Sequence, residues 1–199
     1  MKSIISILIL TLSFTANSQL LVDDFSTGEI STISFDNGES TKSFQKGTTI
    51  LGKLRRLHVK VGENIYNQKP QLTINENDVL AYSSGYDVNS TIYLSYGYDE
   101  NGAKQLNQDL SNYSKIKIEF AAKSAKTGMY LTMFTRNDRA AYSSHVPERE
   151  GKLVFEIPFT KMRKIGEKFT FKDIDHFIFQ FDSRSKTGCN MAINKIWFE

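Results

Sequence analysis

Residues 177–184 read Phe-Ile-Phe-Gln-Phe-Asp-Ser-Arg, and the two-residue period of this stretch decides the fold class. Phe177, Phe179 and Phe181 occupy every second position. Gln180, Asp182 and Arg184 occupy the positions between and after them. Successive side chains of a β-strand point to opposite faces, so the stretch predicts a strand with phenylalanines in the core and polar groups outside.

Similar segments recur on both sides of this stretch at intervals of 8 to 20 residues. The ten expected strands are residues 20–25, 54–61, 71–74, 79–82, 91–98, 114–120, 128–136, 153–157, 177–182 and 191–198. Residues 54–61 place Leu57 and Val59 on one face and His58 and Lys60 on the other. Because no amphipathic helix of three turns interrupts the series, we expect a single all-β domain, an antiparallel jelly-roll sandwich over residues 19–199.

The first residues have the composition of an export signal. Lys2 precedes an apolar run from Ile4 to Phe14, and small residues follow at Ala16-Asn17-Ser18. This pattern predicts a signal peptide over residues 1–18, cleaved before Gln19. The run is shorter than the ~20 residues of a membrane span. We therefore expect a periplasmic or extracellular protein that is not embedded in a membrane.

Net charge and cysteine content limit the classes of partner and cofactor. The formal net charge is only +3, and basic residues alternate with acidic ones, so nucleic acid is not an expected partner. The single cysteine, Cys189, has no partner for an internal disulfide and is expected to be a small buried side chain. We expect no cofactor.

The order of several landmarks resembles the galactose-binding-like jelly-roll sandwich, as in the carbohydrate-binding modules of exported bacterial proteins. The landmarks are Asp23-Asp24-Phe25, Gly52–Arg56, Tyr96–Asp99, Asp109–Tyr113, Phe171–Phe179 and Ile193–Phe198. The resemblance covers almost all of residues 19–199. It implies a β-sandwich that binds saccharide.

The same resemblance implies a structural calcium ion near the first and last strands. Its acidic ligand in the last strand would stand where this chain has the neutral Asn194. Asp23 and Asp24 alone supply few of the six to eight oxygens that calcium takes. We therefore expect no metal.

Catalytic motifs are absent from the sequence. The histidines His58, His145 and His176 lie far apart, and no zinc-protease, nucleophile-elbow or phosphate-loop pattern occurs. A long-range triad remains an alternative, as does a carboxylate pair such as Glu156 and Asp182. We assign no catalytic residue.

Recognition of a saccharide is the better supported expectation. Sugar rings stack on aromatic side chains, and their hydroxyls bind planar polar groups. Two segments, 82–89 and 136–142, are expected to be loops with this mixture, and residues 180–184 add polar groups. The expected ligand-binding residues are Tyr82, Tyr86, Arg136, Asp138, Tyr142, Gln180, Asp182 and Arg184.

Three functions therefore follow in order of preference. The first is an exported, non-catalytic binding module for carbohydrate. The second is a structural or adhesive envelope protein that binds another protein. The third is a small secreted hydrolase or lyase acting on glycans.

Overall fold

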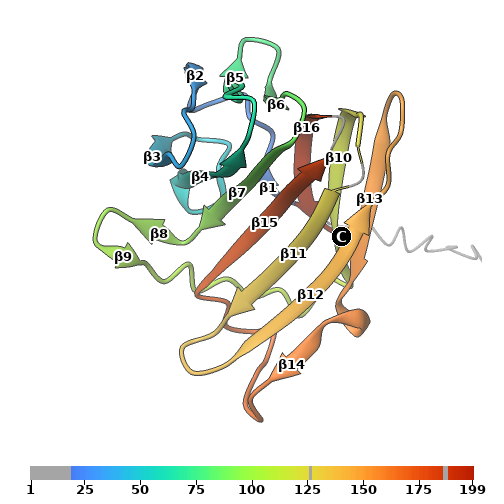
Figure 1. Cartoon of the computed structure of the whole chain (residues 1–199). Coiled ribbons are helices and arrows are strands. Elements are labelled where there is room, and N and C mark those ends of the chain that lie inside the picture. Colours follow the sequence, from blue (N-terminus) through green and yellow to red (C-terminus); the bar gives the residue numbers. More distant parts are fainter. Residues whose placement is uncertain (1–18, 126, 186–187) are drawn as a thin grey trace, which may run out of the picture.

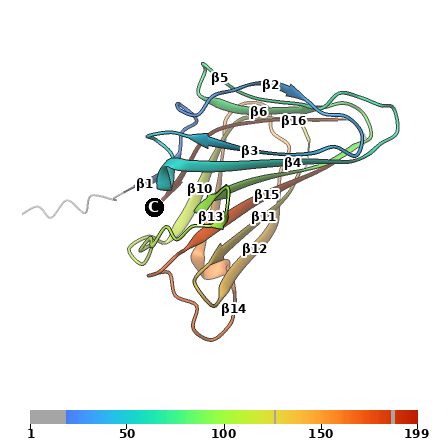
Figure 2. The same ribbon diagram turned by 90° about the vertical axis from the view of Figure 1, so that its left-hand side faces the viewer.

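The computed structural model describes residues 19–125, 127–185 and 188–199, and these residues form two large antiparallel sheets (Figure 1). The export signal expected over residues 1–18 lies outside the described residues. Figure 2 shows strands β2, β5, β6 and β16 of one sheet as a layer above β3, β4, β7 and β15 of the other. The expected antiparallel β-sandwich is confirmed.

The first sheet, sheet A, has seven strands. Its neighbours, in order, are β13 (Leu153–Pro158), β10 (Lys115–Lys123), β16 (Cys189–Phe198), β6 (Val79–Ser84), β5 (Gln71–Asn75) and β2 (Ile30–Ser34). The short β1 (Leu20–Asp23) pairs with the last part of β16, where Leu20 lies opposite Phe198. β6 pairs with the first part of the same strand, from Cys189 to Ile193. β16 is therefore central to sheet A.

The second sheet, sheet B, also has seven strands. Its order is β14 (Arg163–Ile165), β12 (Arg139–Val146), β11 (Thr127–Phe134), β15 (His176–Ser185), β7 (Val88–Tyr96), β4 (Leu54–Asn64) and β3 (Ser40–Lys46). A small hairpin, β8 (Tyr98–Asp99) with β9 (Gly102–Ala103), follows β7. Two 3₁₀ turns complete the described structure, η1 (Leu51–Lys53) and η2 (Phe159–Lys161).

The core lies between the two sheets and is rich in phenylalanine. Phe120 of sheet A meets Phe181 of sheet B edge to face, with ring centroids 6.3 Å apart. Phe198 and Phe177 make a second contact of this kind at 5.8 Å. Phe177, Phe179 and Phe181 are all buried, so the expected orientation of this strand is confirmed. Cys189 is buried as expected.

A buried polar network crosses the core between β1 and β4. The Arg55 guanidinium donates to Asp23 at 2.7 Å and to the Gly28 carbonyl oxygen at 2.7 Å. The Asp23 carboxylate also accepts from the Tyr96 hydroxyl at 2.8 Å and from the Phe25 amide at 2.9 Å. The side chains of Arg55 and Asp23 are both 0% exposed. A charge so buried requires its partner, so the two residues hold β1 against sheet B.

One expected loop was wrong and another began too early. β12 begins at Arg139, where residues 136–142 were expected to be a loop. The expected strand 79–82 is confirmed as part of β6, which extends to Ser84, so Tyr82 does not belong to the expected loop 82–89. β3 and β12 were missed because serine, alanine and threonine dilute their apolar alternation. Tertiary packing, rather than local pattern, makes these segments strands.

Replacing Asp23 by alanine is expected to lower the free energy of unfolding by about 3–5 kcal/mol, because Arg55 would stay buried without its counter-charge. Denaturant unfolding measures this loss. Asp36, which forms an exposed ion pair with Lys69, is the matched control, and Asp36→Ala should cost at most about 1 kcal/mol.

Equal losses in the two variants would contradict this role for Asp23. If Asp23→Ala does not fold, Tyr96→Phe removes a single hydrogen bond to the same carboxylate. A loss of about 1–3 kcal/mol is then expected.

Candidate binding face

The outer face of sheet B gathers polar and aromatic side chains from five neighbouring strands. Residues paired in register on adjacent strands lie side by side on the same face of a sheet. The pairing brings one row of side chains across the sheet: Lys42 on β3, His58 on β4, Tyr93 on β7, Gln180 on β15 and Tyr130 on β11. We call this row the aromatic row, and the outer surface around it the sheet B face.

Rings and an amide–carboxylate pair alternate along the aromatic row. His58 and Tyr93 stack with ring centroids 5.3 Å apart and planes at 24°. The Gln180 amide donates to both carboxylate oxygens of Asp182, at 3.0 and 3.2 Å. Tyr130 is 43% exposed on the far side of Gln180. Tyr93 and Tyr130 are two strands apart, about 10 Å, with hydrogen-bonding groups between them.

Positive charge surrounds the histidine of this row. Burial lowers the pKa of His58 to about 4, and the cations Lys60, Lys42 and Arg56 add to this effect. The ring is therefore neutral near pH 7, and its Nε2 lies 2.9 Å from the Ser40 hydroxyl. A neutral, stacked ring is suited to packing against an uncharged ring of a ligand.

A second aromatic cluster lies at one end of the same face. His176 stacks on Phe134 with centroids 4.4 Å apart and meets Tyr98 edge to face at 4.8 Å. The Arg56 guanidinium lies 3.8 Å from the centre of the Tyr98 ring and donates to the Ser95 hydroxyl at 3.1 Å. Burial, and then Arg56, lower the pKa of His176. The cluster extends the aromatic surface beyond the aromatic row.

The structure brings two of the expected ligand residues together and places two more nearby. Gln180 and Asp182 lie in the middle of the sheet B face. Arg136 and Asp138 lie in the loop between β11 and β12 and line a hollow with His176 and Phe134. The Asp138 carboxylate accepts from the Lys168 amide at 2.8 Å, so it holds the neighbouring loop in place.

The remaining expected residues do not join this surface. Tyr82 is 1% exposed in the core, where its hydroxyl contacts Ser90, so it is not a surface residue. Tyr142 lies on the core-facing side of β12, where it is partly buried and packs against the hydrophobic core. Tyr86 is exposed in the loop between β6 and β7, beside Tyr66. Arg184 belongs to β15, but its side chain lies outside the described residues.

The sequence reasoning missed the partners that complete the row. Tyr93 and His58 lie on the polar faces of two strands that the alternation had correctly identified. The missing information was which strands are neighbours, because β4, β7, β15 and β11 are not consecutive along the chain. The alternation within each strand predicts which face of the sheet a side chain occupies. It does not predict which strands lie next to one another and so bring these side chains together.

The positions considered for calcium are used differently. The Asp23 carboxylate accepts hydrogen bonds from Arg55, Tyr96 and the Phe25 amide. The Asn194 side-chain amide donates to Glu119 at 3.3 Å. Asp24 accepts hydrogen bonds from the Ser26 amide and hydroxyl. Partial burial raises the pKa of Asp24, but hydrogen bonds from Ser26 and Thr49 together lower it below its ordinary value. Over residues 19–125, 127–185 and 188–199, no group of three or more histidine, cysteine or acidic side chains is placed to hold a metal ion.

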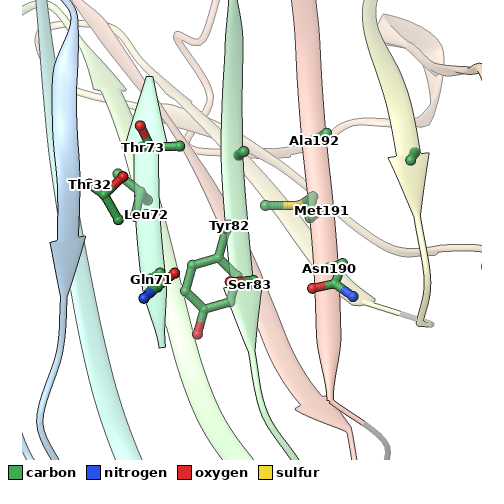
Figure 3. A pocket seen from close by; sticks show the side chains of 11 residues that line it. Thr32, Gln71, Leu72, Thr73, Tyr82, Ser83, Asn190, Met191 and Ala192 are labelled. Carbon is green, nitrogen blue, oxygen red and sulfur yellow. The ribbon is translucent and has the colours of Figure 1, made fainter. Parts of the chain in front are cut away.

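A shallow hollow of about 240 Å³ lies on sheet A (Figure 3). Its outward-facing side chains are small, among them Thr73, Ala81 and Ala192 on three adjacent strands. Gln71 and Asn190 stand at one end, on either side of Ser83 (Figure 3). This hollow offers a surface without charge and without an exposed aromatic ring, unlike the sheet B face.

Among the described residues, no helix has the length and apolar character of a membrane span.

Comparison with known proteins gives similarity only at the level of solved structures. No family model matches the sequence, and no curated protein matches it. A family 11 carbohydrate-binding module from Clostridium thermocellum, solved with a β-1,3-1,4-mixed-linked tetrasaccharide, aligns at 15% identity with a TM-score of 0.43. The alignment covers 90% of this chain and 94% of the module.

Two further structures illustrate the range of the neighbours. The agarase AgWH50C aligns at 11% identity and a TM-score of 0.45, over 90% of this chain and 26% of the agarase. TmCBM61, solved with β-1,4-galactotriose, aligns at 9% identity and a TM-score of 0.34, over 73% of this chain and 88% of that module. At such values the likeness concerns general architecture, so the binding face is judged from its own residues.

His58 is expected to titrate in solution with a midpoint near pH 4, because burial and the three nearby cations disfavour its charged form. Lys60→Met removes one of these cations and should raise the pKa toward the ordinary value of about 6.5. NMR titration of the imidazole signals measures both.

Lys152→Met removes a cation that pairs with Glu119 on sheet A and should leave the His58 midpoint unchanged. A wild-type midpoint near 6.5 would contradict the effect of burial and charge on His58, and an unchanged midpoint in Lys60→Met would contradict the effect of the cations.

Proposed function

We propose that the chain is a non-catalytic binding module that acts outside the cytoplasm and binds carbohydrate on the sheet B face. The observation that carries this proposal is the aromatic row, in which Tyr93 and Tyr130 flank the Gln180–Asp182 pair. Aromatic rings pack on the apolar faces of sugar rings, and an amide–carboxylate pair binds adjacent hydroxyls. The export signal expected from residues 1–18 supports the location.

The shape of the surface favours a chain-like ligand. Aromatic groups continue from His58 and Tyr93 through Tyr130, and again at Phe134 and His176. They are spread over neighbouring strands instead of enclosing one deep cavity. An open face of this kind suits several linked sugar units better than a single small molecule.

The low basicity of His58 in the Ser40–His58 pair favours binding over catalysis. The hydroxyl and Nε2 are 2.9 Å apart, a distance that suits a nucleophile and its base. However, a histidine with a pKa of about 4 is a weak base, and three cations oppose the charge it would gain. Asp182 accepts a hydrogen bond from the neutral side-chain amide of Gln180. A carboxylate held in place by an amide is suited to recognising hydroxyl groups.

Affinity gels and a glycan array test the proposal with the purified domain, and calorimetry on any retained glycan gives the Kd. Tyr130→Ala should weaken binding about tenfold, because a stacking surface worth about 1.4 kcal/mol is removed. Gln180→Ala should weaken binding to a similar extent by freeing Asp182 and deleting the amide.

Tyr86→Ala is the matched control, since Tyr86 is 50% exposed but lies in the loop between β6 and β7. It should change the Kd by less than about twofold. The proposal fails if the domain binds no saccharide, or if Tyr86→Ala weakens binding as much as Tyr130→Ala does.

A further inference from the structure

The charge on the two outer faces of the sandwich is distributed in different ways. On sheet A, Lys115 and Lys117 each pair with both Glu156 and Glu199, and Lys152 pairs with Glu119. These three cations are therefore neutralised by carboxylates within about 3.3 Å, while Lys195 on the same face lies opposite Glu119 and over the Trp197 ring. Pairs of this kind leave little net field above the surface.

The sheet B face carries cations of a different kind. Register places the exposed side chains of Lys42, Lys60, Arg139 and Arg163, with the half-buried Arg56, on this outer surface. In the described part of the chain, none of these five forms an ion pair with a carboxylate, whereas the acidic side chain in their midst is Asp182. At the edge of the face, Glu63 accepts from the Asn89 amide at 3.3 Å.

One of these cations, Lys42, belongs to the aromatic row, and Arg56 and Lys60 lie beside it on β4. Lys42 and Tyr93 are the neighbours of His58 on either side in register. The Lys60 ammonium lies 5.7 Å from the centre of the Tyr93 ring. A ligand stacked on Tyr93 would therefore have the Lys60 ammonium beside it. Burial is the main cause of the lowered pKa of His58, and Lys60, Lys42 and Arg56 lower it further, so these cations lie close enough to act on the row.

We infer that the polysaccharide bound by the sheet B face carries anionic groups, carboxylates or sulfates, that pair with the cations around the aromatic row. The inference rests on the proposed function, since it names the class of saccharide for the same face. Lysine and arginine bind carboxylate and sulfate oxygens by charge-assisted hydrogen bonds, and the rings and the Gln180–Asp182 pair bind the sugar itself.

A saccharide fits these observations better than a nucleic acid does. Asp182 lies at the centre of the face, where its carboxylate can accept hydrogen bonds from the hydroxyl groups of a sugar, whereas a DNA backbone offers only acceptor oxygens there. The net charge of the chain is only +3, below that of a typical nucleic-acid-binding domain. Nucleic acid is therefore included in the test as a competing ligand.

The test compares four probes with the full mature domain: polygalacturonate, dextran sulfate, a neutral mixed-linked β-glucan and duplex DNA. We expect one of the two anionic polysaccharides to bind at least about tenfold more tightly than the neutral glucan at low salt. The difference should shrink as salt is raised, because exposed charges are screened. The two anionic probes distinguish carboxylate from sulfate.

A matched pair of double variants locates the charge effect. Lys42→Gln/Lys60→Gln should weaken binding of the preferred anionic polysaccharide about tenfold. Lys115→Gln/Lys152→Gln removes the same charge from sheet A and should change that Kd less than about twofold. Tyr130→Ala should also weaken binding of the anionic polysaccharide, since the sugar rings take part.

The outcomes separate this inference from the proposed function. Equal or tighter binding of the neutral glucan overturns the anionic preference and leaves the carbohydrate proposal standing. The inference is also overturned if DNA binds most tightly, if the two double variants have equal effects, or if Tyr130→Ala has no effect. In those cases charge alone would explain the binding of the anionic polysaccharide. Binding of no saccharide removes both proposals.

Discussion

The buried pair of Arg55 and Asp23 is the constraint on which the sheet B face depends. Arg55 points from sheet B into the core between the sheets, where its guanidinium donates to Asp23 of sheet A at 2.7 Å. Because side chains alternate along a strand, an inward Arg55 requires Arg56, His58 and Lys60 to point outward. A slip of one residue in β4 would bury these three residues and expose Leu57 and Val59. The ion pair therefore specifies which charges the sheet B face presents.

Such a pair contributes specificity more reliably than stability. Desolvating a guanidinium and a carboxylate costs free energy that their attraction only partly returns. Here, Tyr96, the Phe25 amide and the Gly28 carbonyl complete the hydrogen bonding of both groups. Tyr96 belongs to β7, so the network also aligns β7, which carries Tyr93 on its opposite face. One buried site thus orients two of the strands that present the aromatic row.

Much of the fold was predictable, because its strands obey a simple local rule. The alternation in residues 54–61 and 177–182 correctly separated inward from outward side chains, and these outward residues include Gln180 and Asp182. The export segment and the domain boundary that follows from it stay predictions. β12 could not be recognised, because Ala140, Ser143 and Ser144 have little preference for either face. The site itself depends on neighbours such as β4 and β7, and such long-range pairing leaves no local trace in a sequence.

The pairing of β1 with β16 has a consequence for how the chain reaches this structure. Leu20 lies opposite Phe198, so this contact of sheet A joins segments separated by almost the whole described chain. β16 also pairs with β10 and β6, which are distant in sequence as well. Closing such large loops costs entropy before the contacts form, and folding rates fall as the mean sequence separation of contacts rises. Sheet A is therefore expected to form slowly and late. A newly made chain then stays unfolded for a period, and an unfolded chain is the form that the proposed export through a narrow membrane channel would require.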